Sequence, residues 1–211
     1  MRKLLTVAAL AALALSVAGS AVAKKPTASC RGLTPTISGT QGADVINGTA
    51  GADVIAAGAG DDQVWGHGGN DVICGGPGDD TLQGGDGDDV LDGGQGADLM
   101  DGGVLGCCGP GNGGDDVLYG GNGADTLHAS DFGDNTLHGG NGDDWAQGYG
   151  GDDVVTGGNG DDYLGGFTGT DRLSGGNGDD ELDGGPDADS LDGGRGTDEC
   201  RNGETNTGCE T

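Results

Sequence analysis

An aliphatic residue recurs at every ninth position over most of this chain, and the residues between are mainly glycine and aspartate. When the chain is cut into nonapeptides from Gly39, position eight is Ile, Val, Leu or Met in fifteen of eighteen windows. The windows run from 39 to 201 with one extra residue, Ala129. Triplets centred on position eight, such as VIN at 45–47 and TLQ at 81–83, are rich in strand-forming residues. Their middle side chain points to one face and its neighbours to the other. The pattern predicts one short strand per window, with position eight buried.

Strands of three residues are not stable alone, so they must stack. Stacked in parallel, they pair at about 4.8 Å per coil and bury the position-eight side chains between two sheets. Two nonapeptide windows then make one coil. The sequence predicts an all-β fold, a right-handed parallel β-roll (β-solenoid) of about nine coils.

The other positions of the repeat are equally regular. Glycine stands at position one in sixteen windows and at position four in sixteen, and aspartate stands at position six in sixteen. The windows thus follow G-G-x-G-x-D-x-U-x, where U is aliphatic, and resemble the RTX family of calcium-binding repeats. The resemblance implies that the six-residue turn GGxGxD binds Ca²⁺ and that the triplet x-U-x forms the strand.

The position-six residues are expected to form two columns, because windows n and n+2 stack on the same side. The first expected column is Asp44, Asp62, Asp80, Asp98, Asp116, Asn135, Asp153, Asp171 and Asp189. The second is Asp53, Asp71, Asp89, Cys107, Asp125, Asp144, Asp162, Asp180 and Asp198. Carboxylates about 5 Å apart repel by roughly 3 kcal/mol per neighbour at an effective dielectric of about 20. Each pair therefore needs a cation.

Ca²⁺ is the cation that this composition favours. It accepts six to eight oxygen ligands in flexible geometry, whereas Mg²⁺ demands a tighter octahedron and Zn²⁺ favours sulfur or imidazole. The sixteen aspartates of the two columns are the predicted ligands. Twelve of the sixteen neighbour pairs hold two aspartates, and the four pairs with Asn135 or Cys107 are expected to bind weakly. Position-five aspartates such as Asp61, Asp79, Asp143 and Asp161 are expected to lie in solvent without binding directly.

Composition and charge narrow the classes of partner. The chain has 53 Gly and a formal net charge of -28, which by itself is typical of disorder. The phase of the aliphatic positions argues against disorder in the calcium-loaded protein. The excess of carboxylates excludes nucleic acid and anionic membrane surfaces as partners, since phosphate binding needs Lys and Arg.

The N-terminus has the pattern of a secretory signal peptide. Arg2 and Lys3 precede an apolar run from Leu4 to Ala18, and Ala21-Val22-Ala23 forms a cleavage site. The run is short for a bilayer span and no stop-transfer signal follows, so no membrane insertion is expected. Cleavage would change the net charge from -28 to -30. The expected organisation is a signal peptide at 1–23, an N-terminal cap at 24–38, the β-roll at 39–201 with an irregular segment at 102–110, and a C-terminal cap at 202–211.

Six cysteines in an exported chain favour disulfides over metal ligation. Cys200 replaces the aliphatic residue of the last window and Cys209 lies nine residues on, so we predict a Cys200–Cys209 bridge over the final coil. We predict that Cys30 and Cys74 close the other end. Cys107 and Cys108 are expected to form a vicinal disulfide or to pair across chains, in a segment that loops out of the stack or forms a distorted coil.

Two function classes follow from the sequence. The first is a secreted, extracellular calcium-binding protein whose β-roll folds on binding Ca²⁺. The second is a calcium-dependent adhesion or matrix interaction module, whose protein or glycan partner the sequence does not identify. No zinc helix, nucleophile elbow or pore region is present, so the sequence does not predict an enzyme, and the toxin and protease activities found in the RTX family are not carried over.

Overall fold

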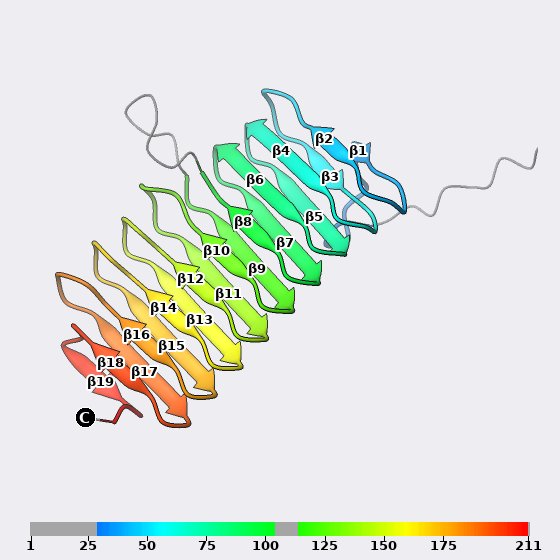
Figure 1. The fold of residues 1–211 in the computed structure, drawn as a ribbon. Helices are drawn as coiled ribbons and strands as arrows, with labels where there is room; N and C mark the ends of the chain where they lie inside the picture. The colour runs from blue at the N-terminus through cyan, green and yellow to red at the C-terminus, as the bar shows by residue number, and fades with distance from the viewer. Residues whose placement is uncertain (1–28, 104–113, 211) are drawn as a thin grey trace, which may run out of the picture.

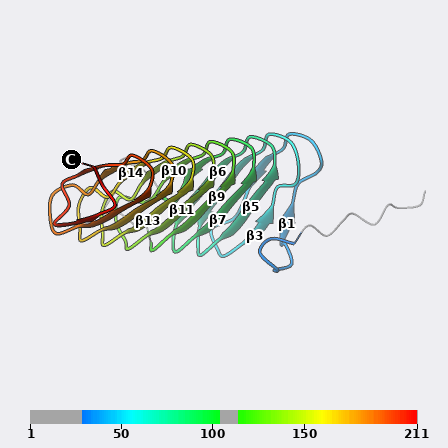
Figure 2. The same ribbon diagram turned by 90° about the horizontal axis from the view of Figure 1, so that it is seen from below.

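The computed structural model describes residues 29–103 and 114–210, which form a stack of flattened coils (Figure 1). Nineteen strands in these residues run in parallel and build two sheets, one on each side of every coil (Figure 2). Within the same residues the structure contains no helix, and so none that is long and apolar enough to span a membrane.

Each sheet collects alternate strands of the chain. The ten-stranded sheet consists of β1 (Ile37–Ser38), β3 (Val54–Ala56), β5 (Val72–Pro77), β7 (Val90–Gln95), β9 (Val117–Asn122), β11 (Thr136–Asn141), β13 (Val154–Asn159), β15 (Arg172–Asn177), β17 (Ser190–Arg195) and β19 (Thr205–Thr207). The nine-stranded sheet consists of β2 (Val45–Asn47), β4 (Gln63–Gly68), β6 (Thr81–Asp86), β8 (Leu99–Asp101), β10 (Thr126–His128), β12 (Trp145–Gln147), β14 (Tyr163–Gly165), β16 (Glu181–Asp183) and β18 (Glu199–Arg201).

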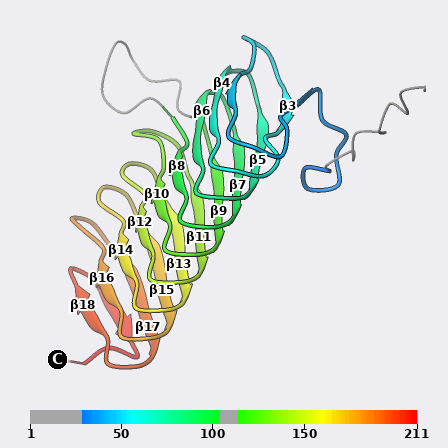
Figure 3. The ribbon, with the colours of Figure 1, turned by 45° about the vertical axis from the view of Figure 1, so that its right-hand side comes forward.

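The pairing register advances by two windows per coil over most of the roll. Val54 pairs with Val72, and Thr156 pairs with Ser174. The prediction of an all-β parallel β-roll of about nine coils is confirmed. Figure 3 shows how the coils follow one another along the roll axis.

The position-eight side chains form the core between the two sheets, as predicted. From Ile46 to Leu191, those in the described residues are all buried, and Cys200 packs against them at the C-terminal end. A fully buried aliphatic side chain contributes about 1.5–3 kcal/mol. With one such residue per window, the core of each coil is thin, so each coil depends on its neighbours for stability.

The register changes around the irregular segment. β7 pairs with β9, and β8 with β10, three windows apart along the chain instead of two. The nine additional residues fall between Gly102 and Gly114. Gly102 still occupies position one of a window, and Gly114 occupies position four of the same window. The Gly102 carbonyl accepts a hydrogen bond from the Gly85 N–H, and Gly102 lies against Asp116. The pairing of the described strands therefore skips one repeat length between β8 and β9. Residues 104–113, with Cys107 and Cys108, lie outside the described residues.

A second, smaller change follows Ala129. The β9–β11 and β10–β12 pairings exceed two windows by a single residue. The Ala129 N–H donates to the Gln147 carbonyl, the bond that position-one residues make elsewhere. Ala129 therefore takes position one and Ser130 position two, and the extra residue lies further along the turn, where an added residue leaves the strands undisturbed.

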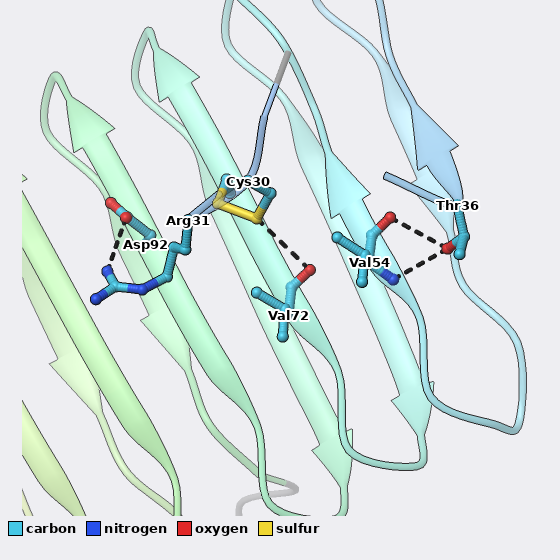
Figure 4. The surroundings of a disulfide bond; sticks show 7 residues. Cys30, Arg31, Thr36, Val54, Val72 and Asp92 are labelled. Atoms are coloured by element: carbon cyan, nitrogen blue, oxygen red, sulfur yellow. Dashed lines mark hydrogen bonds and ion pairs between the residues drawn. A yellow bond between two sulfur atoms is a disulfide. The ribbon is translucent and has the colours of Figure 1, made fainter. Parts of the chain in front are cut away.

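The N-terminal cap closes the first coils on the outside of the ten-stranded sheet (Figure 4). The predicted Cys30–Cys74 disulfide is present, with sulfur atoms 2.07 Å apart. Arg31 reaches further along the roll, to Asp92 at 2.9 Å. Thr36 bonds to the backbone of Val54 in β3, so the chain enters the roll by extending the sheet.

The C-terminal cap is built by the predicted Cys200–Cys209 disulfide. Before the bridge closes, β19 adds a last strand to β17. After it, Glu210 lies on the final coil, where its carboxylate accepts a hydrogen bond from the Asp198 N–H. The tail thus covers the open end of the roll, where strand edges would otherwise be exposed.

Candidate metal centres

The position-six residues form two columns, but their membership differs from the sequence-based one beyond Asp98. The column before the nine-stranded sheet is Asp44, Asp62, Asp80, Asp98, Asp125, Asp144, Asp162, Asp180 and Asp198. The column before the ten-stranded sheet is Asp53, Asp71, Asp89, Asp116, Asn135, Asp153, Asp171 and Asp189. The predicted neighbours Asp98–Asp116 and Asp89–Cys107 were wrong: Asp89 pairs with Asp116 and Asp98 with Asp125, because the register skips one repeat length and exchanges the two columns.

Successive members of a column are joined by a hydrogen-bond ladder. The backbone N–H of each residue donates to the side-chain Oδ1 of the next member, as from Asp80 to Asp98 at 2.8 Å and from Asp144 to Asp162 at 2.8 Å. This bond fixes the carboxylate against the preceding turn. It also leaves the second carboxylate oxygen, Oδ2, facing the interior of the turn.

These second oxygens are buried and unpaired. Fourteen position-six aspartates have an Oδ2 atom with no hydrogen-bond partner: Asp62, Asp71, Asp80, Asp89, Asp98, Asp116, Asp125, Asp144, Asp153, Asp162, Asp171, Asp180, Asp189 and Asp198. A buried charged oxygen without a partner is costly. So regular a set of unpaired oxygens indicates a ligand that supplies the missing positive charge.

Each such oxygen faces a small space, here called a cradle, beside the position-one residue of its own window. That position-one residue is glycine in all but one of the fourteen windows. A Cβ placed on Gly75 would lie 2.2 Å from Asp80 Oδ2 and 2.8 Å from the Gly93 carbonyl oxygen of the next coil. At Gly175 the corresponding distances to Asp180 Oδ2 and the Gly193 carbonyl oxygen are 2.2 and 2.6 Å. A carboxylate and a carbonyl oxygen thus converge on one small space, and oxygen ligands of Ca²⁺ lie at about 2.3–2.6 Å from the ion. In the described residues, no three His, Cys, Asp or Glu side chains form a metal cluster; an ion held at a cradle would take backbone oxygens as further ligands.

Burial disfavours the ionised form of these carboxylates when no cation is bound, and so raises their pKa. Desolvation raises the pKa of Asp89, Asp98 and Asp144 to about 7, from a usual value of 3.8. The charges of neighbours in the column add to the effect, as Asp116 and Asp71 do at Asp89. Protons and cations therefore compete for the same oxygens.

The metal-free chain should respond to pH in the opposite sense to most proteins. Because the folded-state pKa is raised, these groups stabilise the roll fully below the unfolded value of about 4, and this contribution is lost as pH rises through about 6–7. We expect protein freed of metal by dialysis to gain β-type circular dichroism when the pH is lowered from 8 to 5. A β signal at pH 5 no larger than at pH 8 would contradict this expectation.

Three windows satisfy the position-six side chain from within the chain. In the first two, the backbone N–H and hydroxyl of a position-two threonine both donate to Oδ2, from Thr40 to Asp44 and from Thr49 to Asp53. In the third, the Ser130 hydroxyl lies 3.3 Å from Asn135 Oδ1, and the Asn135 amide donates to Asp153 Oδ1 at 3.0 Å. These groups take the place of a cation.

The pKa of Asp53 reflects this substitution. Burial acts to raise it, but hydrogen bonds from the Thr49 backbone, the Thr49 hydroxyl and Thr36 outweigh that effect, so the pKa lies below its usual value. Asp62 differs again: its Oδ2 is unpaired, but position one of its window is Ala57, which carries a methyl group where the other such windows have glycine. Sequence reasoning weighed only position six. The signal it missed was the residue type at positions one and two.

Replacing Thr49 by glycine should open one more site. Thr49→Gly removes the hydroxyl donor and restores GGxGxD in this window, since Gly48 and Asp53 are already in place. We expect isothermal titration to count one additional calcium ion per chain. Thr49→Ser retains the hydroxyl and is the matched control, with no additional ion; equal counts for the two variants would contradict the assignment.

The last cradle in each column is completed by the C-terminal tail, which sequence reasoning did not foresee. The Asn202 carbonyl oxygen faces the cradle at Gly184, and the Gly208 carbonyl oxygen faces the cradle at Gly193. Because no further coil follows within the described residues, these two carbonyls stand where position-one carbonyls would lie. The Cys200–Cys209 disulfide holds Gly208 in this place.

Position-five aspartates are exposed, and they form a ladder of their own. The Asp79 N–H donates to Asp61 Oδ1 at 3.1 Å, and the Asp179 N–H to Asp161 Oδ1 at 2.8 Å. This bond runs in the opposite direction to that of position six. It fixes the outer edge of the turn while position six lines its interior.

A parallel β-roll with buried, evenly spaced carboxylates facing backbone carbonyls defines a calcium-binding repeat protein. Comparison with known families gives the same class: the RTX calcium-binding nonapeptide repeat matches residues 38–73, 75–104, 111–134, 130–164 and 165–200. The chain belongs to this family. A comparison with curated proteins finds no match.

Proposed function

We propose that this protein is exported and that its β-roll folds when Ca²⁺ binds between stacked turns outside the cell. The fourteen buried Oδ2 atoms without a partner are the observation that supports the proposal most directly. Bound Ca²⁺ supplies the positive charge that lets neighbouring carboxylates stay ionised at close range. The chain's own residues place a carboxylate oxygen at each cradle, with a backbone carbonyl oxygen beside it at cradles such as Gly75 and Gly175, and they bury the carboxylate.

The cradles also set the expected number of ions. Of the fourteen unpaired aspartates, Asp62 faces the Ala57 methyl group, which leaves thirteen cradles with a position-one glycine. The columns seen in the structure also contain thirteen neighbouring pairs of aspartates, but these are a different set. They include the closed windows of Asp44, Asp53 and Asp62 and omit the cradles of Asp116, Asp189 and Asp198. We therefore propose thirteen calcium ions per chain in place of the sequence-based twelve.

Export is supported by the sequence at 1–23, which lies outside the described residues, and by the two disulfides. Extracellular calcium modules bind with dissociation constants of about 10⁻⁴–10⁻³ M, so the roll would fold where calcium is abundant.

Titration calorimetry with Ca²⁺ on metal-free protein tests the proposal. We expect about thirteen ions per chain, together with a gain of β-type circular dichroism, whereas Mg²⁺ at the same concentration should produce neither. Fewer than about eight ions, or a similar response to Mg²⁺, would overturn the assignment of the cradles.

A further inference from the structure

An aromatic groove lies on the outer face of the nine-stranded sheet, near the C-terminal end of the roll. It has a volume of about 360 Å³ and is lined by Tyr163, Gly165, Phe167, Asp183, Pro186 and Asn202. The core and the metal cradles use none of these side chains. The groove exists because position nine is glycine at 165, so no side chain fills the space between Tyr163 and Phe167.

Two ring stacks run along the roll at this place. Trp145 and Tyr163 are register partners on β12 and β14, with ring centroids 4.2 Å apart. Tyr149 and Phe167 also stack, with ring centroids 5.1 Å apart. They stand at position two of the windows that follow Trp145 and Tyr163. Trp145 and Phe167 are 45% and 41% exposed, so both stacks present aromatic surface to solvent. This surface is large for a chain whose aromatic content is only 3%.

The backbone under the second stack is held in an uncommon conformation. Tyr149 and Phe167 both have φ of 71°, at position two, where Gly158 and Gly176 of neighbouring windows have φ of 126° and 118°. Large side chains rarely adopt positive φ. Residues held so against local preference are found where function requires them, and here the result is a pair of rings beside the groove.

The charge around the groove favours a cationic occupant. Asp183 pairs in register with Gly165, and the Asn202 side-chain amide donates a hydrogen bond to its carboxylate at 2.7 Å. Arg201, on the next coil, pairs instead with Glu181 and Glu199. Among the described residues, no Lys or Arg side chain forms an ion pair with Asp183. The formal net charge of -28 favours the same sign of partner.

The molecule already binds one arginine in this way, on its other sheet. The Arg31 guanidinium carbon lies 3.9 Å from the centroid of the Tyr119 ring, and Arg31 pairs with Asp92 at 2.9 Å. Asp92 and Tyr119 are register partners on adjacent coils. A ring from one coil and a carboxylate from the next thus hold a guanidinium, and the groove offers the same two groups with no arginine of the described chain upon them.

We propose that this groove binds an arginine side chain of a basic partner protein, with the guanidinium against Tyr163 and Phe167 and in contact with Asp183. A planar guanidinium can stack on an aromatic face and is attracted to it by cation–π interaction. A carboxylate beside the rings adds a charge-assisted hydrogen bond. The side chains of the groove are not among the candidate metal ligands, so an arginine could bind the calcium-loaded roll without displacing an ion.

The test uses the calcium-loaded full-length protein in about 0.15 M salt, which screens diffuse attraction to the negative roll. Trp65→Phe leaves Trp145 as the single tryptophan, whose fluorescence reports on the ring that it stacks against. The probes are the capped peptide Gly-Arg-Gly-Arg-Gly and the same peptide with citrulline, the uncharged counterpart of arginine. We expect the arginine peptide to bind about tenfold more tightly than the citrulline peptide.

Variants separate the groove from the general charge of the chain. Phe167→Gly and Asp183→Asn should each weaken binding of the arginine peptide about tenfold. His67→Gly is the matched control, since His67 also sits at position two with positive φ (79°) but outside the groove; it should bind like the parent. Because glycine suits positive φ, neither glycine variant should lower the melting temperature.

Three results would overturn the proposal. The first is equal affinity for the arginine and citrulline peptides. The second is equal affinity of Phe167→Gly and His67→Gly for the arginine peptide, which would assign binding to net charge alone. The third is binding of a neutral oligosaccharide that is lost in Phe167→Gly while the arginine peptide does not bind, which would identify a sugar site.

Discussion

Removal of calcium at pH 7.5 should convert the β-roll into a largely disordered chain. Without cations, fourteen buried carboxylates have an unpaired oxygen, and neighbours about 5 Å apart repel by roughly 3 kcal/mol each at an effective dielectric of about 20. Burial of one aliphatic residue per window stabilises the roll too little to offset an electrostatic repulsion that recurs at every coil. We expect excess chelator to abolish most of the β-type circular dichroism.

The control is to add back calcium beyond the chelator, which should restore the spectrum, while an equal excess of Mg²⁺ should not. The two disulfides stay intact in this experiment, so a return to the native spectrum reports folding on the cation alone. A spectrum that excess chelator leaves unchanged at pH 7.5 would contradict the role given to the cradles.

A methyl group in one cradle should expel one ion and destabilise the coils around it. In Gly175→Ala, the new Cβ would lie 2.2 Å from Asp180 Oδ2 and 2.6 Å from the Gly193 carbonyl oxygen. The carbonyl belongs to the backbone of the next coil and cannot move aside. Loss of the ion leaves a buried charge without a partner, which costs about 3–5 kcal/mol. We expect one ion fewer by calorimetry and a free energy of unfolding lower by about 3 kcal/mol.

Gly42→Ala is the matched control for this substitution. Gly42 has no atom within 4 Å of an added Cβ and no positive φ, so its free energy of unfolding should change by less than about 0.5 kcal/mol. Urea denaturation of both variants at one fixed calcium concentration makes the comparison. If Gly175→Ala matched Gly42→Ala in stability and ion count, the cradle would not be a calcium site.

Most of the fold could be predicted because the repeat places a strand former, a turn and a core residue in each window. Position eight, the parallel stacking and the Cys200–Cys209 disulfide follow from the nine-residue phase, since a one-residue slip would move a buried Leu to the surface. The exchange of the columns could not be predicted. The register skips one repeat length between Gly102 and Gly114, so the frame of the sequence continues unchanged. Only the pairing of the described strands and of residues such as Asp89 with Asp116 reveals the exchange.

The candidate sites were predictable only at the level of residue type. Position six identifies the carboxylates, but whether a cradle is open depends on atoms from other positions. Thr49 closes one cradle through its hydroxyl and Ala57 another through its methyl group. At the end of the roll, Asn202 and Gly208 contribute carbonyls from a tail that has no repeat, and so no pattern could have indicated them.

The two disulfides also determine how the roll would carry a pulling force. Cys30 and Cys74 are separated by 44 residues, and Cys200 and Cys209 by 9. Tension applied at the N-terminus passes through the sulfur atoms from Cys30 directly to β5, so the strands β1 to β4 lie outside the loaded path and cannot be drawn out. The same holds for β19 at the other end. When the roll is stretched between its two disulfides, length is therefore gained by unwinding the coils between Cys74 and Cys200, while the segments inside the two disulfide loops add none.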